Sequence, residues 1–283
     1  TAILIGTAFV LKELAQEFEG NLKFVFQPGE ETSGGAAGMI EEGVLKDPDV
    51  DAALGLHLWG SSPEGMVEYK SGPFMASPDR FNLKILGKGG HAARPHNTVD
   101  PIPIAAEIIS ALQTIVSRRI DPLDSAVISV CNVEAGSTHN VIPDEAVLKA
   151  TVRSLKSEVR EQLAENIEAV VKNICNIYGA DYQFDYTFGY PAVVNDSQMT
   201  EVLAEAAVKV LGDKRVREKE KAEMGGEDFS YFGLEVPATF YFLGIAPEGE
   251  IINHHQSDFR FNDSVLKDGV AVMAQTALDF LNS

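Results

Sequence analysis

Three separated segments of this chain carry acidic and imidazole side chains of the kinds that bind metal ions. Glu30 and Glu31 follow an apolar run, and His57 lies in the sequence Gly-Leu-His-Leu-Trp. His255 belongs to the third segment, His-His-Gln-Ser-Asp-Phe. Carboxylate oxygen and imidazole nitrogen are ligands of zinc, manganese and related ions, and an additional carboxylate can carry a proton beside the metal. The set therefore favours a metal-dependent hydrolase.

Each segment taken alone has a simpler structural explanation. Two adjacent glutamates are most often a solvated strand end or helix start, and a lone histidine in an apolar strand is more often a hydrogen-bonded core residue than a ligand. The pair His254 and His255 lacks the fixed helical spacing of His-Glu-x-x-His. Position favours a site nevertheless, because ligands of open α/β sheets gather beyond the carboxyl ends of strands, where Glu30 and Glu31 fall.

Apolar periodicity in the two outer parts of the chain predicts alternating helices and strands. Helices are expected at 3–15, 39–45, 198–211 and 265–281, and strands at 21–28, 52–59 and 238–243. Pro28 and Gly29 close the first of these strands. Such alternation favours an α/β sheet.

The middle of the chain has a different pattern. Strands are expected at 81–86, 126–134, 146–153 and 182–188, with helices at 101–118 and 156–178. The resulting order β-α-β-β-α-β is that of ferredoxin-like domains. We therefore expect an outer α/β domain formed by residues 1–76 and 188–283, with residues 77–187 inserted into it.

Composition and motif content exclude several classes of protein. Against 23 basic residues stand 42 acidic ones, and the net charge of -19 repels nucleic acid and anionic membrane surfaces. No apolar run is long enough to span a membrane, so we expect a cytoplasmic protein with reduced Cys131 and Cys175. The sequence Gly-Lys-Gly-Gly-His around His91 lacks the order of a phosphate-binding loop, and its glycines either let the backbone approach a ligand or form a turn.

Taken together, these motifs give the chain a resemblance to the M20 family of dinuclear metallopeptidases. The nearest members are amidohydrolases that act on N-acyl amino acids, hippurate or auxin conjugates. Gln-Pro-Gly-Glu-Glu here resembles the family's Gln-Pro-Ala-Glu-Glu, which implies Glu30 as the general base and Glu31 as a metal ligand. The motif Gly-Leu-His-Leu-Trp likewise implies His57 as a ligand.

The resemblance also distinguishes between the two adjacent histidines. His255 stands four residues before Phe259, as the family's C-terminal ligand does, whereas His254 is one residue too far from that aromatic. The implied cofactor is a pair of divalent ions, of Zn, Mn, Co or Ni. The implied fold is an α/β metallopeptidase-like catalytic domain with an inserted ferredoxin-like α+β lid.

Residues 77–187 resemble that lid, which often dimerises, and Gly-Lys-Gly-Gly-His-Ala-Ala-Arg-Pro-His is its usual motif. The match implies that His91 stabilises the oxyanion, often across the dimer. Asn140 and Arg153 match lid positions that suit a substrate carboxylate as hydrogen-bond donors. Glu227, in Gly-Gly-Glu-Asp-Phe, is expected to support the cleft rather than to bind metal. We thus expect a homodimer that acts on a small N-acyl amino acid.

One departure from the family pattern leaves alternatives open. Members of this type carry Cys-Gly-His-Asp-x-His just upstream of the threonine with which this sequence begins. A fragment without that segment is expected to bind its metals incompletely and to expose a sheet edge. The alternative functions are a noncatalytic binding or dimerisation protein and, less favoured, a metal-free hydrolase in which Glu30 acts with Asp228.

Overall fold

The computed structural model of the chain describes residues 1–32 and 34–283 and contains two compact units. Unit 1 comprises Thr1–Phe74, Val193–Glu223 and Glu227–Ser283, and unit 2 comprises Met75–Ala192 and Met224–Gly226. No helix in the described part of the chain is both long and apolar enough to cross a lipid bilayer.

Unit 1 is built on a four-stranded sheet in the order β1-β12-β2-β11. Strands β1 (Ala53–Pro63) and β12 (Ala238–Ala246) run parallel, and β2 (Val67–Tyr69) is antiparallel to β12 and parallel to β11 (Val216–Glu218). Every residue of β12 is buried, as its nearly continuous apolar sequence requires of a central strand. A separate pair joins β3 (Gly72–Met75) to β10 (Val193–Asn195).

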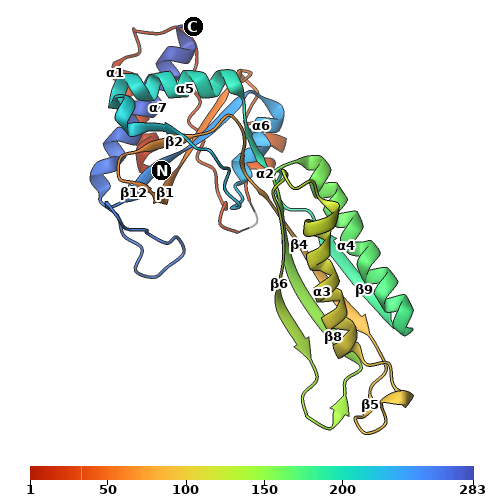
Figure 1. Cartoon of the computed structure of the whole chain (residues 1–283). Helices are drawn as coiled ribbons and strands as arrows, with labels where there is room; N and C mark the ends of the chain where they lie inside the picture. Colours follow the sequence, from red (N-terminus) through yellow and green to blue (C-terminus); the bar gives the residue numbers. More distant parts are fainter. Residues whose placement is uncertain (33) are drawn as a thin grey trace. The chain divides into compact units, whose positions relative to one another are not determined.

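Three long helices of unit 1 pack on one another and on this sheet: α1 (Ala2–Glu13), α5 (Ser197–Leu211) and α7 (Leu266–Leu281). Both α1 and α5 contact α7, and α5 also contacts β12 (Figure 1). Asp196 precedes helix α5 as its N-cap residue, and its side chain accepts a hydrogen bond from the Met199 amide. The shorter helices are α2 (Ala36–Glu41), α6 (Phe232–Glu235), and the 3-10 turns at Asp213–Arg215, Asp228–Tyr231 and Asp263–Val265.

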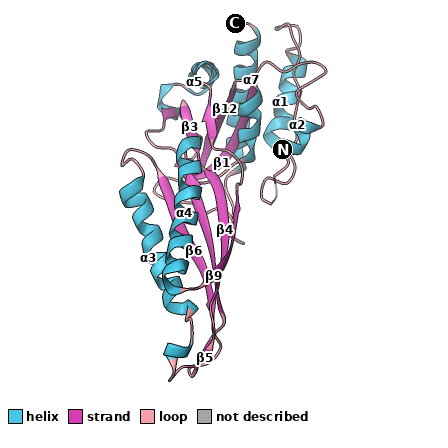
Figure 2. Ribbon diagram, turned by 90° about the vertical axis from the view of Figure 1, so that its right-hand side faces the viewer, coloured by secondary structure: helices cyan, strands magenta, loops and turns pink. Residues whose placement is uncertain are grey.

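Unit 2 contains an antiparallel sheet in the order β6-β8-β4-β9. Its strands are β4 (Ser77–Leu86), β6 (Ala126–Ala135), β8 (Glu145–Ser154) and β9 (Asp181–Thr187). Helices α3 (Pro101–Arg119) and α4 (Ser157–Tyr178) lie on one face of it (Figure 2). At its tip, β5 (Gly90–His91) pairs with β7 (Val141–Ile142), beside a 3-10 turn at Pro95–Asn97. The strand and helix order predicted for the middle of the chain is thus present.

The core of unit 2 follows from two periodicities in its sequence. Along β4, Phe81, Leu83 and Ile85 alternate with more exposed residues, so every second side chain faces the helices. The predicted apolar stripe of α4 is buried against the same face, with Leu163 and Ile167 fully enclosed. Because both periods direct apolar groups to one side, this unit forms a two-layer sandwich.

Two predictions for the first part of the chain were wrong. Residues 21–28 form no strand in the described part of the chain, although their sequence is apolar. A strand needs a neighbour for its backbone hydrogen bonds, and this segment is not part of the sheet β1-β12-β2-β11. The helix expected at 39–45 lies earlier in the chain, at Ala36–Glu41, and begins directly after Gly35.

Candidate metal centre

The two adjacent glutamates lie on a closed loop of unit 1 that leads into α2. Gly29 has a φ of +69°, and its carbonyl oxygen accepts a hydrogen bond from the Gly34 amide at 2.9 Å. The ends of the loop approach closely, since a Cβ on Gly35 would lie 2.1 Å from the carbonyl oxygen of Pro28. Only glycine fits at such an approach, so Gly35 permits the close contact between the two ends of the loop.

Asp228, far away in the sequence, connects the two ends of this loop. Its side chain is fully buried, and Oδ2 accepts hydrogen bonds from the backbone amides of Gly35 (2.7 Å) and Ala36 (2.8 Å). Oδ1 accepts a hydrogen bond from Nε2 of Gln27, which also donates to Oε1 of Glu227 at 3.4 Å. Both oxygens of Asp228 are thus used in structural contacts, which argues against the alternative in which it hydrolyses substrate without metal.

Three carboxylates converge beside the loop. Glu30, Glu227 and Asp228 each offer an oxygen, and these atoms lie within 4.8 Å of one another. Burial, together with the charges of Glu227 and Glu31, raises the pKa of Glu30 to about 7. Burial likewise raises the pKa of Glu227 to about 7. A divalent cation would relieve this arrangement, because positive charge nearby favours the ionised form of each acid.

His57 enters the same region from β1. Its Nδ1 lies 2.6 Å from the carbonyl oxygen of Leu58, and since a carbonyl only accepts, the proton resides on Nδ1. The lone pair of Nε2 is then available to a metal, which is the arrangement in which imidazole usually binds one.

His254 packs beside this ring but has a backbone partner of its own. Its centroid lies 5.3 Å from that of His57, and its Nε2 accepts a hydrogen bond from the Gly60 amide at 3.1 Å. Burial lowers its pKa, which favours the neutral, accepting ring. His254 therefore holds the chain against the end of β1.

His255 turns the other way, toward the glutamate loop. It has a φ of +60°, in the left-handed region that residues with a side chain seldom adopt. This backbone brings its Nε2 to 3.5 Å from Oε2 of Glu31. Two of the predicted metal ligands, from segments more than 200 residues apart, thus lie next to each other.

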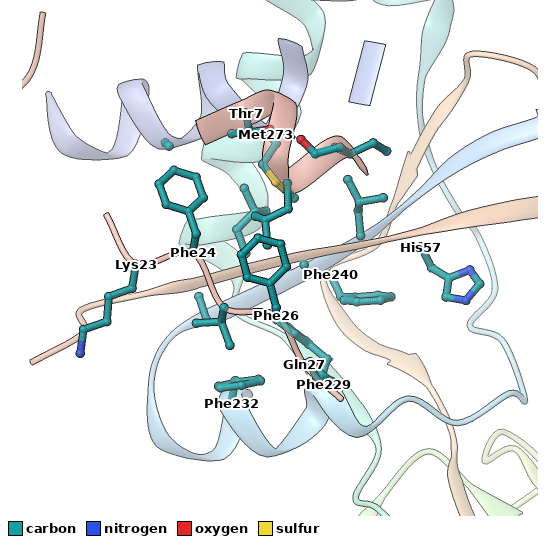
Figure 3. A pocket seen from close by; sticks show the side chains of 18 of the residues that line it. Thr7, Lys23, Phe24, Phe26, Gln27, His57, Phe229, Phe232, Phe240 and Met273 are labelled. Atoms are coloured by element: carbon teal, nitrogen blue, oxygen red, sulfur yellow. Dashed lines mark hydrogen bonds between the residues drawn. The ribbon is translucent and has the colours of Figure 1, made fainter. Parts of the chain in front are cut away.

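A cavity of about 1170 Å³ in unit 1 connects these groups. Its polar lining includes Glu30, Glu31, His57, Glu227, His254 and His255. Apolar side chains form the rest of the wall, among them Phe24, Phe26, Phe240 and Met273. Figure 3 shows Phe26 and Phe240 in the middle of the cavity and His57 toward one end. The predicted acids and imidazoles therefore line one shared cavity, with Glu31 and His255 at its exposed side.

The predicted residues of unit 2 fall into two separate places. His91 is on β5, and the Ala92 amide after it donates to the carbonyl oxygen of Asn140, so these two residues are neighbours at the tip. Arg153 lies near the far end of β8, opposite Pro78. From Glu145 to Arg153 the strand advances eight residues, about 27 Å at roughly 3.4 Å each. A small substrate cannot contact both places within one copy of unit 2.

Sequence reasoning missed the part that Gln27 and Asp228 play. The sequence identifies Gln27 only as the first residue of a motif, and Asp228 only as a possible second acid. Their one shared signal is that each adjoins a predicted site glutamate, Gln27 in Gln-Pro-Gly-Glu-Glu and Asp228 in Gly-Gly-Glu-Asp-Phe. Contact between motifs about 200 residues apart depends on the fold, which the spacing does not encode.

Comparison with known proteins identifies the family. Residues 1–279 match the model of peptidase family M20/M25/M40, and the chain belongs to this family. It is 38% identical to N-acetylcysteine deacetylase of Bacillus subtilis, over 100% of this chain and 72% of that protein. It is 37% identical to thermostable carboxypeptidase 1 of Saccharolobus solfataricus, over 99% of this chain and 71% of the relative.

A solved structure agrees with these matches. The YXEP protein of Bacillus subtilis, a dinuclear metal binding peptidase from the M20 family, superimposes with a TM-score of 0.82 and 34% identity, over 99% of this chain and 70% of that one. The chain is therefore a hydrolase with the α/β fold expected from its sequence. Metal-dependent cleavage of an amide bond is the reaction class that this family defines.

Proposed function

We propose that this protein hydrolyses the amide bond of N-acyl amino acids, with Glu30 as the general base. One observation carries the proposal: Glu30, Glu31, His57 and His255, from three distant segments, line a single cavity. A deacetylase of an N-acetyl amino acid and a carboxypeptidase among the relatives support an amide next to a free carboxylate as the substrate class.

Two divalent cations, Zn²⁺ or Mn²⁺, are the proposed cofactors. The donor types fit these ions, because Glu31 offers an oxygen and His57 and His255 offer imidazole nitrogens. Three donors shared between two ions are expected to hold them incompletely. The buried acids nearby supply negative charge that a cation would balance. When bound, the ions supply Lewis acidity and a lower pKa for the attacking water.

Glu30 moves the proton in this scheme. Its carboxylate takes a proton from the attacking water, and the water oxygen forms a bond to the amide carbonyl carbon. As the C–N bond breaks, Glu30 gives the same proton to the departing amine. A base with a pKa near 7 suits both transfers, because it neither holds nor releases the proton too strongly at neutral pH.

Unit 2 is proposed to act as a lid and dimerisation domain. His91 would donate a hydrogen bond to the oxyanion, and Asn140 or Arg153 would bind the substrate carboxylate. The distance along β8 between the tip and Arg153 supports a homodimer, in which two copies of unit 2 present different ends to a substrate. The cytoplasmic location remains a prediction.

The experiment is hydrolysis of N-acetyl amino acids followed by release of the free amine. Turnover should disappear after treatment with a chelator and return when Zn²⁺ or Mn²⁺ is added. The control is the same protein carried through the procedure without chelator, which should keep its turnover. Undiminished turnover in the chelated protein would contradict the proposal.

A further inference from the structure

The glutamate loop does not hold its shape by local contacts alone. Within it, the carbonyl oxygen of Gly29 is bonded to the Thr32 and Gly34 amides, which shape the turn. The loop's entry at Gln27 and its exit at Gly35 are joined through one side chain from elsewhere, Asp228. Removal of that side chain would leave the turn intact but free its two ends.

We propose that Asp228 is a positioning residue that fixes Glu30 and Glu31 by fastening both ends of their loop. The inference rests on the proposed function, because it concerns the residues that act in that reaction. It does not make Asp228 a ligand or a catalytic residue: the side chain has no exposed surface, and both of its oxygens are already occupied by donors.

The geometry gives this one carboxylate three donors in two directions. Oδ2 accepts hydrogen bonds from the backbone amides of Gly35, just before α2, and Ala36, its first residue. Oδ1 accepts a hydrogen bond from the side chain of Gln27. Hydrogen bonds to an ionised acceptor inside a protein are stronger than those between neutral groups. Water competes poorly for the carboxylate, because Asp228 itself has no exposed surface.

The neighbouring Glu227 strengthens the same connection. Its Oε1 accepts a hydrogen bond from the Phe229 amide at 3.0 Å and a longer one from Gln27. The first bond fixes Glu227 to the short turn Asp228–Tyr231, so the pair of acids moves as one element. Loosening of Asp228 therefore displaces the loop relative to His57, which lies on β1 and does not depend on this connection.

The test compares three variants by amide hydrogen exchange and by kinetics. Asp228→Leu has a similar size but accepts no hydrogen bond, whereas Asp228→Asn keeps one acceptor oxygen for the Gly35 and Ala36 amides. Ser230→Ala is the matched control: Ser230 is equally enclosed in the same turn, and its Oγ has no hydrogen-bond partner among the described residues.

In Asp228→Leu we expect the exchange of the Gly35 and Ala36 amides to rise about 10-fold or more, since a charge-assisted bond protects each of them. We expect kcat to fall about 10- to 100-fold, with KM within about twofold, as for other supporting residues of metal sites. Asp228→Asn should restore most of both quantities, and Ser230→Ala should match the wild type.

The inference is overturned if Asp228→Leu exchanges these amides at the wild-type rate, or if Ser230→Ala produces the same changes and so reveals a general packing effect. If Asp228→Leu does not fold, Gln27→Met decides instead, because it removes the donor to Oδ1 at the entry of the loop. A wild-type kcat in Gln27→Met would then overturn the inference. Exchange is measured without substrate. Failure of the proposed reaction would therefore appear as an inactive wild type, independently of this result.

Discussion

Replacement of Glu30 by glutamine removes the proposed base while nearly preserving the shape of the side chain. General base catalysis contributes about 10²- to 10⁴-fold in rate, which corresponds to about 3 to 5 kcal/mol of barrier. We therefore expect kcat for an N-acyl amino acid to fall by that factor. Stability should not fall, because the charges of Glu227, Glu31 and Asp228 all disfavour ionisation of Glu30 in the folded protein.

The pH dependence of the wild type provides a second measure of the same residue. Glu30 acts as a base only when ionised, and its raised pKa of about 7 keeps it protonated in acid. Activity should thus rise as pH rises, with a midpoint at or below about 7, because bound cations favour the carboxylate. The residual activity of Glu30→Gln should lack this rise.

The assay is steady-state hydrolysis between pH 5 and pH 9, with bound metal measured on the same samples. Glu30→Gln should retain its metal, since the proposed ligands are Glu31, His57 and His255. Glu42→Gln, exposed and outside the cavity, serves as the control for loss of a negative charge. A turnover of Glu30→Gln within about threefold of the wild type would refute the reasoning, because no base contributes so little.

Three further predictions follow from other contacts. Burial raises the pKa of Glu227 from 4.5 to about 7, so the metal-free protein should lose up to about 3 kcal/mol of stability as the pH rises from about 4.5 to about 7. Calorimetry should show a smaller loss in Glu227→Gln. A Cβ on Gly60 would lie 1.8 Å from the carbonyl oxygen of Ile252, so Gly60→Ala should displace the segment that carries His255. We expect metal binding, measured by titration calorimetry, to weaken about 10-fold or more, and an unchanged affinity would contradict this. In unit 2, Asp79→Asn removes the buried negative charge that pairs with the guanidinium of Arg160 and should cost about 3 to 5 kcal/mol in urea unfolding, with metal affinity unchanged.

The sequence predicted what depends on periodicity. The strands and helices of unit 2 were located because alternation along β4 and the stripe of α4 are strong local signals. The strand predicted at 21–28 does not form, because an apolar run becomes a strand only beside a partner strand. Periodicity does not reveal whether such a partner is present. The three-residue strands β2, β10 and β11 are too short to show any period.

For the site, the sequence predicted residues but not their mutual support. Glu31 and His255 were named from separate motifs, and the structure brings their side chains to 3.5 Å. The choice of His255 over His254 rested on spacing alone, whereas the structure adds a physical difference, the Gly60 amide bound to His254. The role of Asp228 was invisible, because it arises from three donors that only the folded chain brings together.

The central claim is that Glu31, His57 and His255 hold the cations on which hydrolysis depends. The most direct measurement is the number of Zn²⁺ or Mn²⁺ ions bound per chain, made on the same samples as hydrolysis of an N-acetyl amino acid, for the wild type and His57→Ala. We predict that turnover rises in proportion to bound metal and that His57→Ala loses both. Turnover that persists in metal-free protein, or metal binding and turnover that are unchanged in His57→Ala, would contradict it.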